Sequence, residues 1–307
     1  MKIYKYMGPE ILKLAMQNEG TCNFKFSLPE EFNDPYELFL VLNFHQEPDL
    51  LATYRDAIGD IPQMPTTCFS RSPNVIPMWA HYAHNHSGVM IEFDEEIFLK
   101  HFPDGAQFGD VKYLEKANDD LLGILMRASR IGKPRYFVFL QQGVFQTAYF
   151  TKHSSWSYEQ ERRLIVDKKY VRSEGNMLLL DFPVECISAL IVGHNASDET
   201  RESVSEIAEE IGANYFELKI SKLNPEPYFK DMNNDSYLFQ EGAITKCNHV
   251  CAQCEEPLSE RAELCHWCSV EEHHTIYAQT RNPLRILAHV GYLEEYYQSM
   301  LDIGRKK

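Results

Sequence analysis

Hydrophobic and polar positions alternate or recur at helical spacing along the first 225 residues, in short segments separated by turn residues. Residues 3–6 suit a short strand, and Gly8-Pro9 begins a helix that Gly20 ends. Residues 21–26 are extended again. This order of strand, helix and strand, broken by Gly and Pro, predicts an α+β domain.

The same reading continues through the middle of the chain. A hydroxyl-rich strand is expected at residues 66–72, a helical turn at 79–84, a strand at 89–93, a helix-rich stretch at 115–150, and a strand at 163–166. Residues 186–221 then form a strand–helix–strand unit with Ser197 as the helix N-cap. Val204, Ile207, Ala208 and Ile211 recur at helical spacing and are expected to face the core.

Two Cys-x-x-Cys pairs follow this domain, ten residues apart, in the segment CNHVCAQCEEPLSERAELCHWC. Each pair can turn two thiolates toward one ion, and a short β-hairpin between them would complete the tetrahedron that Zn²⁺ accepts. We therefore predict a structural zinc ribbon with Cys251, Cys254, Cys265 and Cys268 as ligands. Three nearby residues lie close enough to replace a ligand: Cys247, His249 and His266.

The boundaries follow from these patterns: residues 1–240 form the α+β domain, and residues 245–307 form the zinc module and a terminal helix broken near Pro283. Zinc ribbons bind proteins or nucleic acid, so the module predicts a macromolecular partner of either kind. An oligomer through the terminal helix remains open.

Composition limits the class of protein. The net charge is −15, and the segment from Thr245 carries seven Lys and Arg against nine Asp and Glu, so the preceding part is near −13. This excess disfavours broad, unspecific coating of DNA. Clustered cysteines, with no apolar leader and no long apolar run, predict a protein of the cytoplasm without a membrane span.

Three polar clusters, FNDPYE, MWAHY and WSYEQERR, contain groups that a core would not select. Glu159 and Glu161 are two residues apart, so on a strand or its entry loop they share a face. Such a pair can hold a ribose hydroxyl, stabilise a cation or bind a metal. The structural alternative is a solvated acidic edge countered by Arg162 and Arg163.

The other clusters have similar alternatives. Trp79, His81 and Tyr82 suit either a packed aromatic cluster or a wall that stacks on a planar ligand. Asn33 and Asp34 suit either a turn or a binding site.

The set FNDPYE, CFSRS, MWAHYAHNHSGVMIEFD, WSYEQERRLIV and a late IVG strand resembles the bacterial family known as domain of unknown function 2971, over about residues 1–225. A second resemblance, to the ADP-ribosyltransferase superfamily, is carried by IYKYMGPEILKLAMQNEG, TTCFSRS and EQE in that order. It implies a mixed-sheet fold with a helical insertion, and NAD as substrate.

That second resemblance also implies roles for single residues. Glu161 would be the catalytic carboxylate, with Glu159, Ser70 and Tyr6 beside it. NAD would be bound by Lys5 and Ser72, with Trp79 or Tyr82 stacking on nicotinamide. The polar clusters add Asn33, Asp34, His81 and Arg163 as candidate binding residues. Lys5 departs from the His or Arg expected at its position.

Three functions follow as hypotheses. The first is an NAD-consuming ADP-ribosyltransferase-like enzyme, such as a toxin or phage-defence effector acting on a macromolecule. The second is a non-enzymatic binding protein that recognises its partner through the zinc ribbon. The third is a metal-dependent nuclease that uses Asp34, Glu37, His81 and Glu161.

Overall fold

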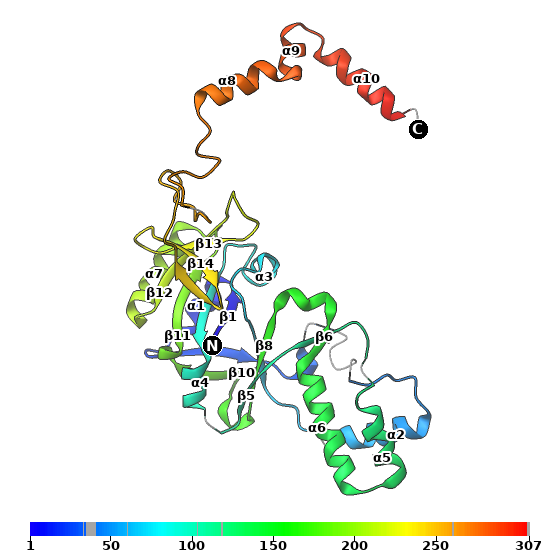
Figure 1. The fold of residues 1–307 in the computed structure, drawn as a ribbon. Coiled ribbons are helices and arrows are strands. Elements are labelled where there is room, and N and C mark those ends of the chain that lie inside the picture. The colour runs from blue at the N-terminus through cyan, green and yellow to red at the C-terminus, as the bar shows by residue number, and fades with distance from the viewer. Residues whose placement is uncertain are drawn as a thin grey trace. The chain divides into compact units, whose positions relative to one another are not determined.

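A computed structural model describes residues 1–32, 34, 41–59, 61–102, 104–117, 119–259 and 261–305. The chain divides into two units, Met1–Lys246 and Cys247–Lys307 (Figure 1). Among the described helices, none has the length and apolar character needed to cross a membrane.

A ten-stranded sheet forms the centre of the first unit. Nearly all of its neighbouring strands are antiparallel, and β11 and β12 run parallel. Across the sheet the strands are, in order, β15 (Ala243–Lys246), β14 (Ser236–Gln240), β13 (Tyr228–Lys230), β12 (Asn214–Lys219), β11 (Ile187–Val192), β4 (Val89–Asp94), β1 (Lys2–Met7), β3 (Thr66–Ser70), β8 (Glu161–Val166) and β5 (Ala106–Asp110). The α+β fold class is therefore confirmed, and β8 begins two residues before the expected Arg163.

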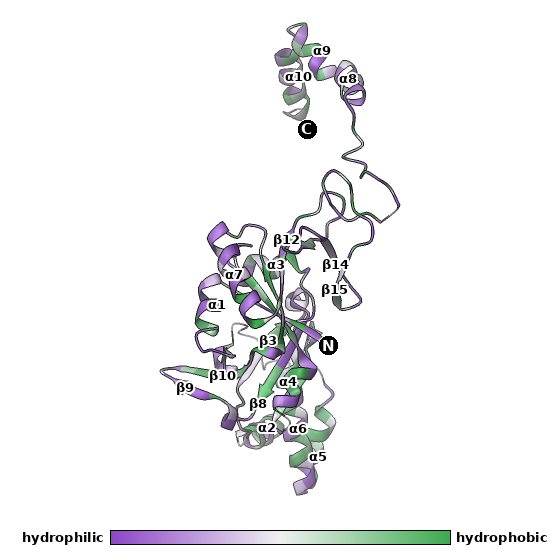
Figure 2. Ribbon diagram, turned by 90° about the vertical axis from the view of Figure 1, so that its left-hand side faces the viewer, coloured by the Kyte–Doolittle hydropathy of each residue, from purple (hydrophilic) through white to green (hydrophobic). Residues whose placement is uncertain are grey.

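Strand β1 shows how the sheet separates two cores. Because successive side chains of a strand point to opposite faces, Ile3 and Met7 enter one hydrophobic cluster and Tyr4 and Tyr6 the other. Hydrophobic residues accordingly concentrate in the central strands, whereas α7 and β9 are largely hydrophilic (Figure 2).

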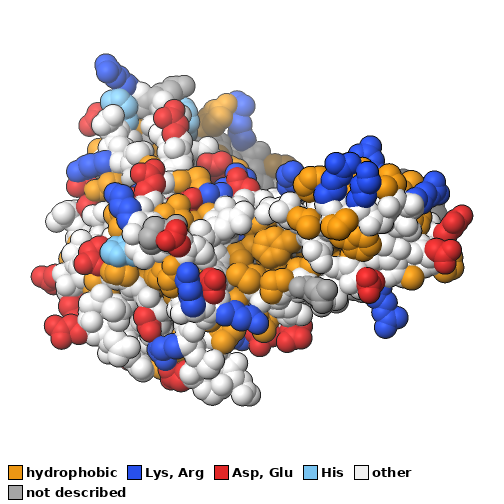
Figure 3. All heavy atoms as spheres, turned by 90° about the horizontal axis from the view of Figure 1, so that it is seen from below, with side chains coloured by type: hydrophobic (Ala, Val, Ile, Leu, Met, Phe, Trp, Pro, Cys, Tyr) orange, Lys and Arg blue, Asp and Glu red, His pale blue; other side chains and the backbone are white. Residues whose placement is uncertain are grey.

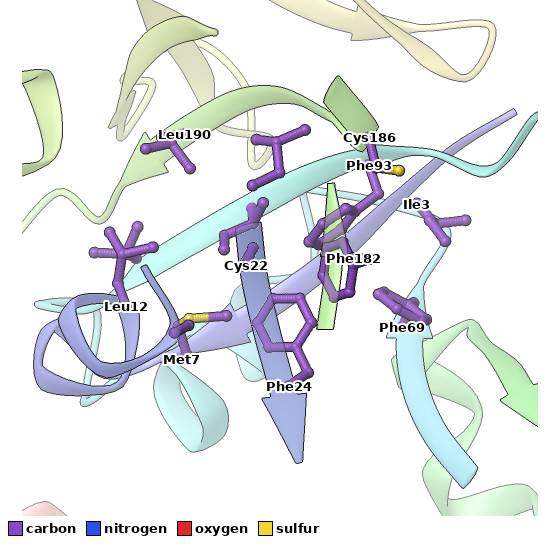
Figure 4. Packing of buried hydrophobic residues seen from close by; sticks show 14 of the residues in the cluster. Ile3, Met7, Leu12, Cys22, Phe24, Phe69, Phe93, Phe182, Cys186 and Leu190 are labelled. Carbon is purple, nitrogen blue, oxygen red and sulfur yellow. The ribbon is translucent and has the colours of Figure 1, made fainter. Parts of the chain in front are cut away.

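The core with Ile3 and Met7 lies between this sheet and a second, three-stranded sheet. The second sheet has the order β2 (Thr21–Phe26), β10 (Met177–Pro183) and β9 (Arg172–Glu174). Phe24 of β2 meets Phe93 of β4 edge to face, with ring centroids 5.4 Å apart (Figure 4). Helices α1 (Pro9–Ala15), α4 (Glu95–His101) and α7 (Asp198–Ile211) contribute to the same core.

Helix α7 links the parallel strands β11 and β12. The hydroxyl of Ser197 accepts a hydrogen bond from the Thr200 amide, which confirms the expected N-cap. Val204 and Ala208 are buried, and Ile207 and Ile211 pack against the same core. The predicted strand–helix–strand unit is thus confirmed.

A helical insertion follows β6 (Lys112–Leu114). Helices α5 (Leu122–Ile131) and α6 (Pro134–Phe150) form a hairpin that packs on α2 (Pro48–Gly59) around a core of their own. Gly132, at φ +64°, ends α5 in the left-handed conformation that glycine adopts without strain. Helix α6 leads directly into β7 (Thr151–His153), which pairs with β6.

The second unit contains the cysteine pairs and, among its described residues, three helices. These are α8 (Glu272–Arg281), α9 (Pro283–His289) and α10 (Leu293–Arg305). The break near Pro283 is confirmed. A second break occurs at Gly291, whose φ of +80° no other residue type adopts easily.

Candidate functional site

Strands β1 and β3 diverge at the centre of the large sheet. They pair directly at Tyr4 and Ser70, and the next positions of the ladder do not pair. Lys5 lies at this split: its Nζ donates to the carbonyl of Cys68 and to Oγ1 of Thr67, both over 2.8 Å. The side chain of Lys5 thus satisfies a backbone carbonyl, that of Cys68, near the point where the ladder stops.

A pocket of about 530 Å³ opens at the split. This volume is within the range of small-molecule sites. Residues from β1, β2, β3, α3, β7, β8 and the 3-10 helix Ser154–Glu159 line it. They include seven of the predicted site residues: Lys5, Tyr6, Ser70, Tyr82, Glu159, Glu161 and Arg163. Aromatic groups of the wall include Phe24, Phe32 and Phe69.

Glu161 is the first residue of β8 and lies opposite Ser70 of β3. Only 3% of its surface is exposed. Arg163 donates to both carboxylate oxygens, over 2.6 and 3.2 Å, and Lys152 donates to Oε2 over 3.2 Å. Burial alone would raise the pKa of Glu161, but the charges of Arg163 and Lys152 outweigh it and lower the pKa to about 2. Glu161 is therefore ionised.

Glu159 reaches the same place from a different element. It ends the 3-10 helix Ser154–Glu159, and Gln160, at φ +46°, turns the chain into β8. Its Oε2 accepts from Lys152 over 2.7 Å and its Oε1 from the hydroxyl of Tyr82 over 2.7 Å. Burial raises the pKa of Glu159 above its ordinary value, against the effect of Lys152. Lys152 thus joins two carboxyl groups whose pKa values are shifted in opposite directions.

This arrangement corrects the interpretation of WSYEQERR as a solvated acidic edge. Both carboxylates are buried, and of the two arginines Arg163 shares the face of β8 on which Glu161 lies. Arg162 points to the opposite face, where it binds Glu95 and Asp110. Alternation along β8 therefore sends the two arginines to different partners.

Tyr6 and Ser70 converge on the carbonyl of Ser72. The Tyr6 hydroxyl donates to it over 2.8 Å and the Ser70 hydroxyl over 3.2 Å. Ser72 itself is buried, and its Oγ accepts from the amide of Asn74. These three residues brace the turn between β3 and α3 (Ile76–Tyr82), and Ser72 does not line the pocket.

Three other predicted binding residues that the structure describes lie outside the pocket lining. Trp79 is completely buried, stacks edge to face on Tyr6 and donates to the carbonyl of Pro73, as the packed-cluster alternative expects. His81 is exposed and contacts the hydroxyl of Tyr158. Asp34 is buried outside the pocket lining. Asn33 lies outside the described residues, as does Glu37 of the nuclease hypothesis.

Lys152 was not predicted as a site residue. It is buried in β7, and Trp156 lies against its ammonium group, 4.7 Å from Nζ to the ring centroid. The sequence offered one signal for this role: a single lysine that follows a predominantly apolar helix and precedes Glu159 by seven residues. Nothing local in the sequence indicated that it bridges the two glutamates.

The four cysteines of the second unit converge as predicted. The sulfurs of Cys251, Cys254, Cys265 and Cys268 all lie within 4.8 Å of one another. Cys254 and Cys265 are 3.9 Å apart, close to the edge of a tetrahedron with metal–sulfur bonds of about 2.3 Å. The amides of Cys265 and Cys268 donate to the sulfurs of Cys251 and Cys265, each over 3.3 Å. The cluster could therefore bind a metal ion.

The surroundings of this cluster differ from the expectation in one respect. Turns lie within the two cysteine pairs; the described residues between the pairs have bends and no β-hairpin, and Pro257 forms an isolated bridge with Val250, which precedes the first pair. Within the described chain, the cysteine quartet is the one group of three or more metal-binding side chains close enough for an ion. Cys247, His249 and His266 are not part of it. The described residues of the nuclease hypothesis, Asp34, His81 and Glu161, are not part of such a group either.

Residues 78–164 match the model of a family described as "Protein of unknown function (DUF2971)". This segment contains two of the motifs on which the first resemblance was based, MWAHY and WSYEQERR. No curated protein matches the chain. A solved structure, "Thermus sp. 2.9 DarT in complex with ADP-ribosylated ssDNA", is similar at 12% identity and a TM-score of 0.28, covering 69% of this chain and 88% of that one. A TM-score this low is no basis for assigning the fold.

Proposed function

We propose that the first unit cleaves the bond between nicotinamide and ribose in NAD and transfers ADP-ribose to a macromolecule. One observation carries the proposal: two buried carboxyl groups, Glu159 and Glu161, share Lys152 at the floor of one pocket. Paired carboxyl groups in unlike environments are what the cleavage of glycosidic bonds requires.

Glu161 supplies a fixed negative charge. When the bond from C1′ of the ribose to the ring nitrogen breaks, its electron pair stays with nicotinamide, which leaves as a neutral molecule. The ribose carbon becomes an oxocarbenium-like cation, and a carboxylate held ionised by Arg163 stabilises it without reorganising.

Glu159 would then act on the acceptor. As the acceptor oxygen or nitrogen bonds to C1′, it must lose a proton, and a carboxylate with a raised pKa is a better base than an ordinary one. Lys152 and Tyr82 fix the orientation of this carboxylate.

The charges of the pocket also suit a dinucleotide. Lys152 and Arg163 are paired cations, Lys5 adds an amine whose pKa is lowered by burial, and Glu159 and Glu161 are the acidic groups of the lining. A ligand that combines a pyrophosphate with a positively charged ring finds both signs there. The wall residue Tyr82 offers a ring for stacking on nicotinamide.

The test measures nicotinamide release and transfer of labelled ADP-ribose, using the full chain, NAD and fractionated cell extract. Glu161→Gln should reduce nicotinamide release by about a hundredfold or more. Glu92→Gln is the matched control, since Glu92 is equally buried, bonds Tyr4 and Ser188, and does not line the pocket. Equal rates in these two variants, or no turnover by the unaltered chain with any extract, would overturn the proposal.

For the second unit we propose Zn²⁺ as the ion of the cysteine quartet, with a structural role. Four thiolates leave no coordination position for a substrate, so the ion would hold the fold of this segment. The held segment would present a surface to a macromolecular partner. If partner binding survives Glu161→Gln and is lost in Cys251→Ser, recognition by this unit is separate from catalysis.

A further inference from the structure

The α5–α6 hairpin is positively charged, in contrast to the negative net charge of the whole chain. Residues 121–158 contain no Asp or Glu and five Lys or Arg, in a chain whose net charge is −15. Four of the five cations lie at the tip of the hairpin and are exposed: Arg127, Arg130, Lys133 and Arg135. The hairpin tip therefore attracts polyanions locally, although the net charge of the whole chain repels them at long range.

Three of these cations, Arg127, Lys133 and Arg135, act on the hydroxyl of Tyr136. Arg135 donates to the Tyr136 hydroxyl over 3.0 Å, with its guanidinium 4.9 Å from the ring centroid. The pKa of this hydroxyl is lowered by the hydrogen bond from Arg135 and further by the charges of Lys133 and Arg127. None of the four cations forms an ion pair with an acidic residue in the described part of the chain.

Apolar and amide groups continue the surface along α6. Phe139 is 52% exposed and lies one turn beyond Arg135 on the same face. Gln142 and Gln146 follow at helical spacing and are also exposed. Figure 3 shows Lys and Arg side chains together with hydrophobic ones on the lobe formed by these helices. An exposed aromatic ring beside guanidinium groups can stack on a base while the cations bind phosphates.

We propose that this surface, formed by the hairpin tip and the exposed face of α6, binds single-stranded nucleic acid. Three of its four cations are arginines, which bind phosphate through two parallel hydrogen bonds. The same face continues with the side-chain amides of glutamines, which can form hydrogen bonds with bases and cannot form them with lipid tails. Helix α6 has 17 residues, so the surface extends over about 25 Å and ends at the strand that holds Lys152.

The inference does not depend on the proposed function, because binding is measured without NAD. The probe is a fluorescent single strand of about 15 nucleotides, whose anisotropy is followed with the full chain at several salt concentrations. Arg127→Gln/Arg130→Gln should weaken binding about tenfold and reduce the salt slope by about one. Phe139→Ala should weaken binding about tenfold with an unchanged slope.

Lys100→Gln/Lys168→Gln removes two exposed cations elsewhere in the same unit and should leave binding unchanged. Circular dichroism of each variant checks that the helices remain. The inference is overturned if the unaltered chain binds no single strand, or if the control pair weakens binding as much as the hairpin pair. It is also overturned if the hairpin pair abolishes binding to anionic vesicles and leaves oligonucleotide binding intact.

Discussion

The ammonium group of Lys152 lies 2.7 Å from Oε2 of Glu159, and both side chains are buried. Residues only seven positions apart thus form a buried ion pair at the floor of the pocket. Removing one partner of such a pair leaves an uncompensated charge, which costs more than the pair itself contributes.

Lys152→Met should therefore destabilise the first unit by about 3 kcal/mol, as measured by urea unfolding. Lys152→Met/Glu159→Gln should lose less than the sum of the two single variants, because the orphaned carboxylate is gone. Strict additivity would mean that the two groups do not interact in the folded protein.

The stability of the first unit should depend on Glu161 in acid. Its pKa of about 2 lies below its ordinary value of 4.5, so the ionised carboxylate stabilises the fold above pH 4.5. This contribution, about 3 kcal/mol, should be lost as the pH falls from 4.5 toward 2. Urea midpoints measured over this range should fall less steeply in Glu161→Gln, and parallel profiles would contradict the assignment.

Gly193 should not tolerate a side chain. A Cβ at this position would lie 2.1 Å from the carbonyl oxygen of His86, in a turn that holds the ends of β4 and β11 together. Gly193→Ala should cost about 1 to 3 kcal/mol. The control is Gly123→Ala in α5, because a Cβ at Gly123 would have no atom within 4 Å. This variant should be about 0.5 to 1 kcal/mol more stable than the unaltered chain. Thermal unfolding of both variants checks the contrast.

Removal of the metal should unfold the cysteine segment and spare the first unit. A segment that is folded around one metal ion loses its fold when the ion is removed. A chelator should therefore speed tryptic cleavage after Arg261, which lies exposed between the cysteine pairs. Cleavage after Lys168 and Lys169 in the first unit serves as the internal control and should keep its rate. An unchanged rate after Arg261, with metal loss verified by elemental analysis, would argue against a structural ion.

The sequence by itself determined those features that depend on neighbouring residues. The cysteine quartet follows from the spacing of two short motifs, and the Ser197 cap and the apolar face of α7 follow from helical periodicity. The break at Pro283 follows from the missing amide of proline. Each of these is an interaction within a few positions along the chain, which a linear pattern records.

Only the tertiary structure decided the state of the candidate site. Glu159 and Glu161 have the same local pattern whether solvated or buried, and their burial results from the pairing of β8 with β3 and from Lys152 on β7. The net charge likewise concealed the basic hairpin: its cations are readable in the sequence of residues 127–135, but their exposure on one surface was decided by the packing of α5 on α6. Ionisation and binding depend on which groups lie within a few ångströms, and that is set by contacts between residues far apart in sequence.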